Sequence, residues 1–229
     1  MDTIHLEPYT GSSRLSQIIL GGQDGLVNVL GVILGVATAS HETRIVLAGG
    51  LAATFAESIS MGAVAYTSQM AERDRYLAEL AKEKKEIEEK PEEETEEIRA
   101  IYKAKGFSGR LLEEIVEHIT SHKDIWITTM MREELGLSPI RTKHVVAGSL
   151  VVGLSAIVGS LIPLIPFFIF SIGEGVVVSL VISTIALFIV GVYKARTTVG
   201  TPIKSGVEIA IIGMGAALIG YLIGVIFQR

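Results

Sequence analysis

The stretch SQIILGGQDGLVNVLGVILGVATAS, residues 16–40, is long and apolar enough to cross a membrane as one helix. A helix needs about 20 apolar residues to span the hydrocarbon core of a bilayer. Asp24 is the only ionisable residue in this stretch. The stretch therefore predicts a spanning helix that holds one acidic group where a charge is costly, and such a group by default marks a functional site.

Four further stretches of the same kind follow along the chain, at about residues 45–68, 144–166, 172–193 and 203–227. The second contains one charged residue, Glu57. The third ends at Pro163 and Pro166, where proline can end a helix. Five spans, an odd number, place the two termini on opposite sides of the membrane.

The overall composition agrees with a protein that crosses a membrane several times. The chain has 229 residues, 49% of them hydrophobic, with 20 basic and 25 acidic residues. Its mean hydropathy is nevertheless positive, at +0.49. Most charges lie in 69–143 and none in 145–173. This segregation predicts a soluble insert between the second and third spans, and hence segments at 1–68, 69–143 and 144–229.

Composition also excludes several classes of function. The chain has no cysteine, which rules out disulfides, zinc–thiolate sites, iron–sulfur clusters and cysteine nucleophiles. The net charge of −5 offers no general basic surface for nucleic acid. The first 15 residues are polar and lack the pattern of a signal peptide.

Basic residues near the ends of the spans predict the orientation, because Lys and Arg concentrate on the cytosolic side. One set of flanks holds Arg14, Arg73, Arg75, Arg132, Arg141, Lys143, Lys194, Arg196 and Lys204. The opposite flanks hold only Arg44 and Arg229. We expect the N-terminus and the insert in the cytosol and the C-terminus outside. The membrane would be the cell membrane in a prokaryote, which the short termini favour, or the vacuolar membrane in a eukaryote.

The insert is expected to be helical throughout. Residues 69–89 continue the second span, residues 92–105 follow Pro91, and residues 109–135 end at Gly136, which is suited to a helix C-terminus. The predicted fold is therefore an all-α integral membrane protein with five transmembrane helices and a cytosolic three-helix insert. Small residues recur every four positions at Gly31/Gly35, Ala48/Ala52/Ala56/Ser60 and Gly220/Gly224. Such faces allow close helix packing, either within one chain or between two copies.

Two carboxylates inside the spans are the first candidates for a site. Asn28 lies one turn beyond Asp24, and Met61 lies one turn beyond Glu57. Carboxylate oxygen combined with thioether sulfur suits a transition metal better than Na⁺ or Mg²⁺. The alternative is that Asp24 caps its helix near the interface and that Met61 only packs.

The insert holds a second candidate, a dense acidic run. Residues 82–97 contain nine Glu and four Lys, and such runs are usually only solvated. Two Glu-x-x-Glu pairs flank Pro91, namely Glu83 with Glu86 and Glu94 with Glu97, so the two helices could turn these pairs toward each other. Further along, Met130 and Glu134 are spaced one helical turn apart. Spacing alone leaves a divalent metal site and a charged surface as alternatives.

Short motifs in every part of the chain resemble the vacuolar iron transporter family. They are GGQDGL at 21–26, SISMG at 58–62, MMREELGL at 130–137, LIPL at 161–164 and KAR at 194–196. The resemblance implies a non-enzymatic homodimer without a resident cofactor that exports Fe²⁺, with Mn²⁺ as a second candidate, in exchange for protons. It implies an ion pathway at Asp24 and Met61. It further implies an insert metal site formed by Glu83, Glu86, Glu94, Glu97, Met130, Met131 and Glu134.

The chain departs from the family at one position of the second span. The eukaryotic members usually have an acidic residue two turns before the span's methionine, and Ala53 stands there in this chain. Glu57, one turn before Met61, lies on a similar face and is expected to substitute for it. The departure leaves the proton stoichiometry open, and carboxylate–thioether sites also bind Co²⁺ and Zn²⁺.

Two alternative functions come from other classes. The insert could be a membrane-anchored ferroxidase or iron store, since ferritin-like bundles use Glu pairs across helices, although their Glu-x-x-His motifs are absent here. It could instead be a metal sensor that gates a separate permeation path.

Overall fold

The structure, a computed structural model, describes residues 10–228, so the expectations that concern residues 1–9 and Arg229 lie outside the described residues. All regular elements in the described range are helices, as predicted. They are α1 (Thr10–Ser40), α2 (Thr43–Glu89), α3 (Pro91–Ala104), α4 (Gly109–Thr120), α5 (Lys123–Thr129), η1 (Met130–Glu134), α6 (Thr142–Leu164), α7 (Pro166–Ile169), α8 (Ile172–Thr197) and α9 (Pro202–Phe227).

Five of these helices, α1, α2, α6, α8 and α9, are long and apolar enough to cross a membrane, which confirms the predicted number of spans. Helix α2 has 47 residues. At about 1.5 Å per residue it is roughly 70 Å long, more than twice the ~30 Å hydrocarbon core. Only its apolar part, residues 45–68, is needed to span, so the charged residues 69–89 lie outside the spanning segment.

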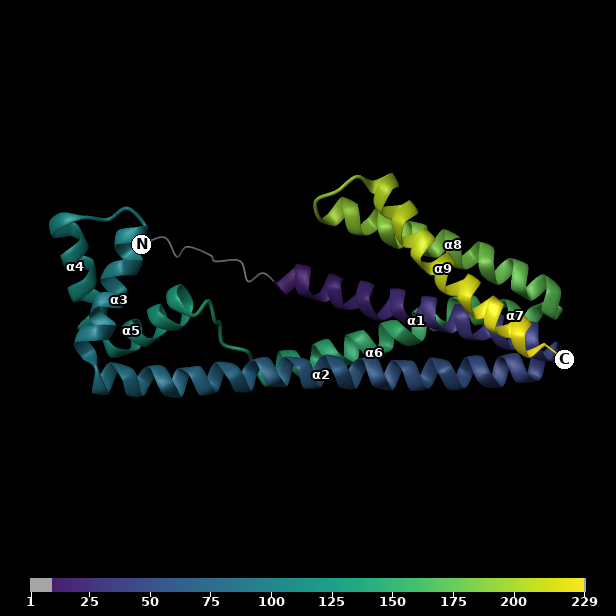
Figure 1. The fold of residues 1–229 in the computed structure, drawn as a ribbon, viewed down its shortest axis with the longest axis horizontal. Coiled ribbons are helices and arrows are strands. Elements are labelled where there is room, and N and C mark those ends of the chain that lie inside the picture. The colour runs from purple at the N-terminus through teal and green to yellow at the C-terminus, as the bar shows by residue number, and fades with distance from the viewer. Residues whose placement is uncertain (1–9, 229) are drawn as a thin grey trace. The chain divides into compact units, whose positions relative to one another are not determined.

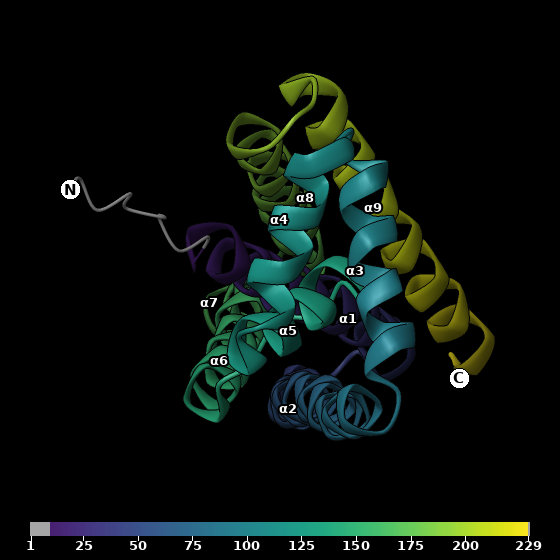
Figure 2. The same ribbon diagram turned by 90° about the vertical axis from the view of Figure 1, so that its left-hand side faces the viewer.

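The chain forms two compact units. The first, called the bundle here, comprises Met1–Tyr66 and Val146–Arg229, and the second, called the insert, comprises Thr67–Val145. Within the bundle, α8 and α9 lie side by side, and α1 packs against both (Figures 1 and 2).

Glycines set the distance between α1 and α9. A Cβ atom on Gly220 would lie 2.0 Å from the carbonyl oxygen of Gly31, and one on Gly224 would lie 2.4 Å from that of Gly35. The small-residue pairs of the first and last spans therefore contact each other within one chain. The third set, Ala48, Ala52, Ala56 and Ser60, is exposed on α2.

This close approach predicts that Gly220→Ala destabilises the bundle. The added methyl group must push two backbones apart, and overpacking of this kind costs about 1–3 kcal/mol. The matched control is Gly215→Ala in the same helix, since a Cβ at Gly215 meets nothing within 4 Å. Thermal unfolding of the two variants in detergent checks the prediction, and equal midpoints would contradict it.

The predicted single helix at 109–135 is wrong, because the structure divides it into α4, α5 and the π-helical turn η1. The break falls at Ser121 and His122, and the backbone of His122 is extended. Both side chains bond the carbonyl oxygen of His118, Ser121 Oγ at 3.1 Å and His122 Nδ1 at 2.8 Å. Such local bonds compete with continuation of a helix. Gly136, with φ of 63°, follows η1 as expected for a helix C-terminus.

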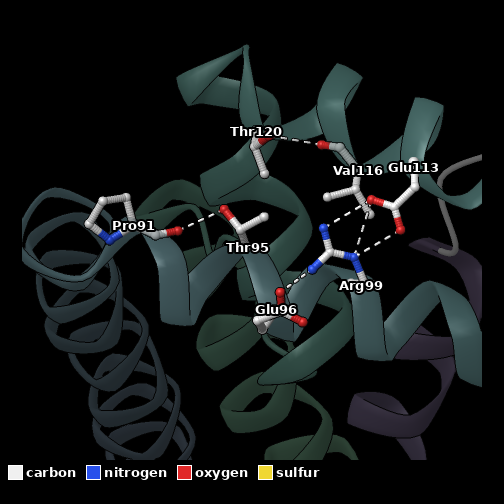
Figure 3. A network of polar contacts seen from close by, with 7 residues as sticks. All are labelled: Pro91, Thr95, Glu96, Arg99, Glu113, Val116 and Thr120. Carbon is white, nitrogen blue, oxygen red and sulfur yellow. Dashed lines mark hydrogen bonds and ion pairs between the residues drawn. The ribbon is translucent and has the colours of Figure 1, made fainter.

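The insert has a hydrophobic core of its own. It comprises Ile87, Ile98, Leu112, Val116, Ile119, Trp126, Ile127, Met130 and Met131. On its surface, Arg99 of α3 pairs with Glu113 of α4, with Nη2 and Oε2 3.0 Å apart, and also with Glu96 (Figure 3). The core and this ion-pair network together hold α3 against α4.

Candidate functional site

The structure brings together the two carboxylates that the sequence places inside the spans. The carboxyl group of Glu57 on α2 shares side-chain hydrogen bonds with Asp24 and Asn28 on α1. Met61 is half-buried one turn beyond Glu57 on α2. Two adjacent carboxylates repel each other strongly where the dielectric constant is low, and a proton or a cation between them relieves that repulsion.

Glycines beside Asp24 hold α1 in position. A Cβ atom on Gly21 would lie 2.2 Å from the carbonyl oxygen of Val152, and one on Gly25 would lie 2.3 Å from that of Ala156. Both contacts are with α6, and α1 runs as one helix through this region. The glycines around Asp24 thus serve close helix packing, which fixes the height of the carboxylate in the bundle.

Asp24 also lines a cavity of about 570 Å³, together with Gln23 of α1 and Lys194 of α8. The sequence alone does not associate Lys194 with Asp24, because no local pattern relates the end of α8 to the start of α1. Gln23 could have been noticed as a polar neighbour of Asp24 in an otherwise apolar span.

In the insert, the turn at Pro91 brings Glu83 of α2 and Glu94 of α3 together. Their side chains share a hydrogen bond, and the two residues are only 4% and 5% exposed. Glu83 Oε1 and Glu94 Oε2 have no hydrogen-bond partner within the described part of the chain. Burial, followed by the negative charge of Glu94, raises the pKa of Glu83 to about 8. The pair therefore holds a proton at neutral pH, and two of its four carboxyl oxygens are buried without a hydrogen-bond partner in the described part of the chain.

The remaining predicted glutamates surround this pair. Desolvation, and then the charges of Glu97 and Glu94, raise the pKa of Glu134. The negative charge of Glu86 contributes to raising the pKa of Glu83, Glu94 and Glu134. Over residues 10–228, however, no three His, Asp or Glu side chains are grouped closely enough to hold a metal ion. The five glutamates form an acidic patch, two of whose members are the buried pair, without a closed coordination shell.

The two methionines lie in the core of the insert. Met130 is 0% exposed and Met131 2%, whereas Glu134 is exposed. The expected pairing of Met130 and Glu134 assumes an α-helix, but in η1 the N–H of Leu135 donates to the carbonyl of Met130, five residues earlier, at 3.2 Å. Such π-helical turns are frequent at functional sites. A ligand role for either methionine stays a prediction.

Substitution of Met130 separates its packing role from a ligand role. Met130→Ala is expected to destabilise the insert by about 2–5 kcal/mol, because it leaves a cavity in the core. Met130→Leu keeps the volume and is expected to cost less than about 1.5 kcal/mol. Isothermal titration of the folded Leu variant with Mn²⁺ then tests the thioether, and an affinity equal to that of the wild type would contradict a ligand role.

Comparisons of the sequence with a family model and with known proteins indicate the same family. The model of the VIT family matches residues 15–225. The chain is 31% identical to vacuolar iron transporter 1 of Arabidopsis thaliana, over 96% of this chain and 89% of the relative. It is 32% identical to vacuolar iron transporter 1 of Oryza sativa subsp. japonica, over 93% and 85%. It is also 32% identical to the vacuolar iron transporter of Plasmodium falciparum (isolate 3D7), over 94% and 83%.

Proposed function

The chain belongs to the VIT family, and from this premise we propose that it exports Fe²⁺, with Mn²⁺ as a second substrate, from the cytosol in exchange for protons. Family membership makes it a multi-pass membrane transporter and not an enzyme. Iron is the cargo named for its relatives. The observation that most supports exchange is the carboxyl pair of Asp24 and Glu57, which two spanning helices bring into contact.

The paired carboxyls explain why metal and protons would exchange. Two carboxylates in contact inside a membrane need positive charge between them, which either a divalent cation or protons supply. A protonated carboxyl is a poor ligand, so protonation from the far side would release the metal. Met61 adds a soft sulfur donor near Glu57, which favours Fe²⁺ over Mg²⁺.

In the proposed mechanism, the acidic patch of the insert collects the ion first. Glu83, Glu86, Glu94, Glu97 and Glu134 supply carboxylate oxygens, with Met130 and Met131 as further candidate ligands. The ion then passes Met61, Glu57 and Asp24. Basic flanks support a cytosolic insert and N-terminus, and hence export from the cytosol.

We also propose a homodimer. The exposed residues Ala48, Ala52, Ala56 and Ser60 form a small-residue face on α2 that suits close contact with a second copy. Cross-linking of single cysteines at Ala52 and Ala56, in a chain without native cysteine, would test this contact.

Flux in sealed proteoliposomes tests the function directly. Full-length protein is expected to move Fe²⁺ when a pH gradient is imposed, with proton movement in the opposite direction, and to move much less without the gradient. Empty liposomes and a protonophore are the controls. Binding without flux would favour a sensor or store, and rapid Fe²⁺ oxidation would favour a ferroxidase.

A further inference from the structure

Three adjoining cavities lie at the end of the bundle where α1 begins, α8 ends and α9 begins. The first, of about 350 Å³, is lined by polar residues that include Lys194, Lys204 and Glu208. The second, of about 570 Å³, shares Lys194 with the first. The third, of about 490 Å³, shares Leu15, Ile19 and Gln23 with the second and has an almost entirely apolar lining. Together they form one amphipathic channel on the surface of the bundle.

The first cavity, at the polar end of the channel, has an excess of positive charge, and Asp24 adds one acidic group to the second cavity beside it. Lys194 and Lys204 form no ion pair within the part of the chain that the structure describes, and Glu208 is the single acidic residue in the lining of the first cavity. The hydroxyl groups of Thr198 and Thr201 lie in the same lining. Two ammonium groups beside hydroxyl groups suit a phosphate group.

The apolar end has the dimensions of one lipid tail. Its lining extends along α1 from Leu15 to Leu26, which at about 1.5 Å per residue corresponds to roughly 16 Å. This equals about half of the ~30 Å hydrocarbon core, the depth of one leaflet. Leu154 and Val158 of α6, at its edge, are 61% and 64% exposed, so the groove is open to the surrounding lipid.

We propose that this channel binds an anionic phospholipid. Its phosphate lies between Lys194 and Lys204, and one acyl chain lies in the groove formed by α1, α6 and α8. Gln23, which lines both the second and third cavities, is placed to donate a hydrogen bond to the ester region between headgroup and chain. The charge of the polar end selects an anionic lipid over a zwitterionic one. In the orientation proposed above, this end faces the cytosolic leaflet, where anionic lipids are concentrated. Asp24 of the proposed ion pathway also lines the second cavity, so the lipid lies beside that pathway, but the inference does not depend on which metal is transported.

Native mass spectrometry of the full-length protein, incubated with phosphatidylglycerol or phosphatidylcholine, tests the charge of the site. K194Q/K204Q is expected to lower retention of phosphatidylglycerol about tenfold and to leave phosphatidylcholine unchanged. K194R/K204R should retain the lipid, which shows that positive charge is sufficient, while unchanged retention of phosphatidylcholine by K194Q/K204Q shows that this variant is folded. The matched control K84Q/K103Q removes the same charge from the insert, and an equal effect there would overturn the proposal.

A groove variant tests the acyl chain. V158W places a large ring at the edge of the groove and is expected to lower retention of phosphatidylglycerol, whereas V181W, at a similarly exposed position outside the groove, should not. Millimolar inorganic phosphate should not displace the lipid. Displacement by phosphate, or no effect of V158W, would mean a site for a free anion and would overturn the proposal. A dimer that dissociates in V158W would instead identify a second copy as the occupant.

Discussion

Asp24→Ala is expected to abolish Fe²⁺ movement driven by a pH gradient in proteoliposomes. Removal of this carboxylate leaves Glu57 without its partner and deletes one oxygen donor from the proposed pathway. Loss of residues that only support metal ligands costs about 10–100-fold in affinity or activity. Loss of a ligand itself should cost at least as much. The readout is the initial rate of Fe²⁺ flux per inserted protein.

Two further variants make this result specific to the carboxyl pair. Glu57→Gln keeps the shape of the side chain and should also abolish coupled flux while leaving metal binding by the insert intact. Glu42→Gln changes an exposed acidic residue before α2 and should leave flux unchanged. Flux at the wild-type rate in either Asp24→Ala or Glu57→Gln would remove the pair from the mechanism.

In metal-free buffer, the insert is expected to lose stability as the pH rises from about 5 to 8. Burial and the charge of Glu94 raise the pKa of Glu83 from 4.5 to about 8, so the folded insert binds a proton that the unfolded chain has already released in this range. The stability from this proton is complete below the unfolded pKa and is lost as the pH passes the folded pKa. Since one pKa unit is worth about 1.4 kcal/mol, the part of this stability that is lost between pH 5 and 8 is on the order of 3 kcal/mol.

The single tryptophan of the chain allows this to be measured in the intact protein. Trp126 is 7% exposed in the core of the insert, so its fluorescence during urea titration reports unfolding of that unit. Glu83→Gln, which stays neutral, should flatten the pH dependence and be more stable than the wild type at pH 8. Glu92→Gln, an exposed residue of the same acidic run, is the control.

Binding of a metal ion should stabilise the folded insert, whereas rising pH destabilises it. A cation that binds the deprotonated pair of Glu83 and Glu94 stabilises the folded insert and replaces the proton. Mn²⁺ at pH 8 is therefore expected to restore stability in the wild type and much less in Glu83→Gln. A midpoint that does not depend on pH or on Mn²⁺ would contradict both the buried proton and the metal site.

The sequence by itself determined the number of spans, because the length and apolarity of a segment are local properties that decide whether it can cross a bilayer. It also singled out Asp24 and Glu57, since a charge inside an apolar stretch is costly wherever the neighbouring helices lie. The turn at Pro91 and the helix end before Gly136 could also be predicted from the sequence, because each depends on the backbone preference of a single residue.

Only the tertiary structure decided which of these residues meet. The contact of Glu57 with Asp24 depends on packing between helices that no local pattern encodes. The turn at Pro91 predicts that Glu83 and Glu94 approach each other, but their near-complete burial depends on that packing as well. Local bonds at Ser121 and His122 lie at the break in the helix predicted at 109–135, and residues from all of its parts lie in the core of the insert. The same core buries the side chain of Met130, which spacing alone had paired with Glu134. Sequence spacing places residues along one helix, whereas the environment of a side chain depends on what the rest of the chain places beside it.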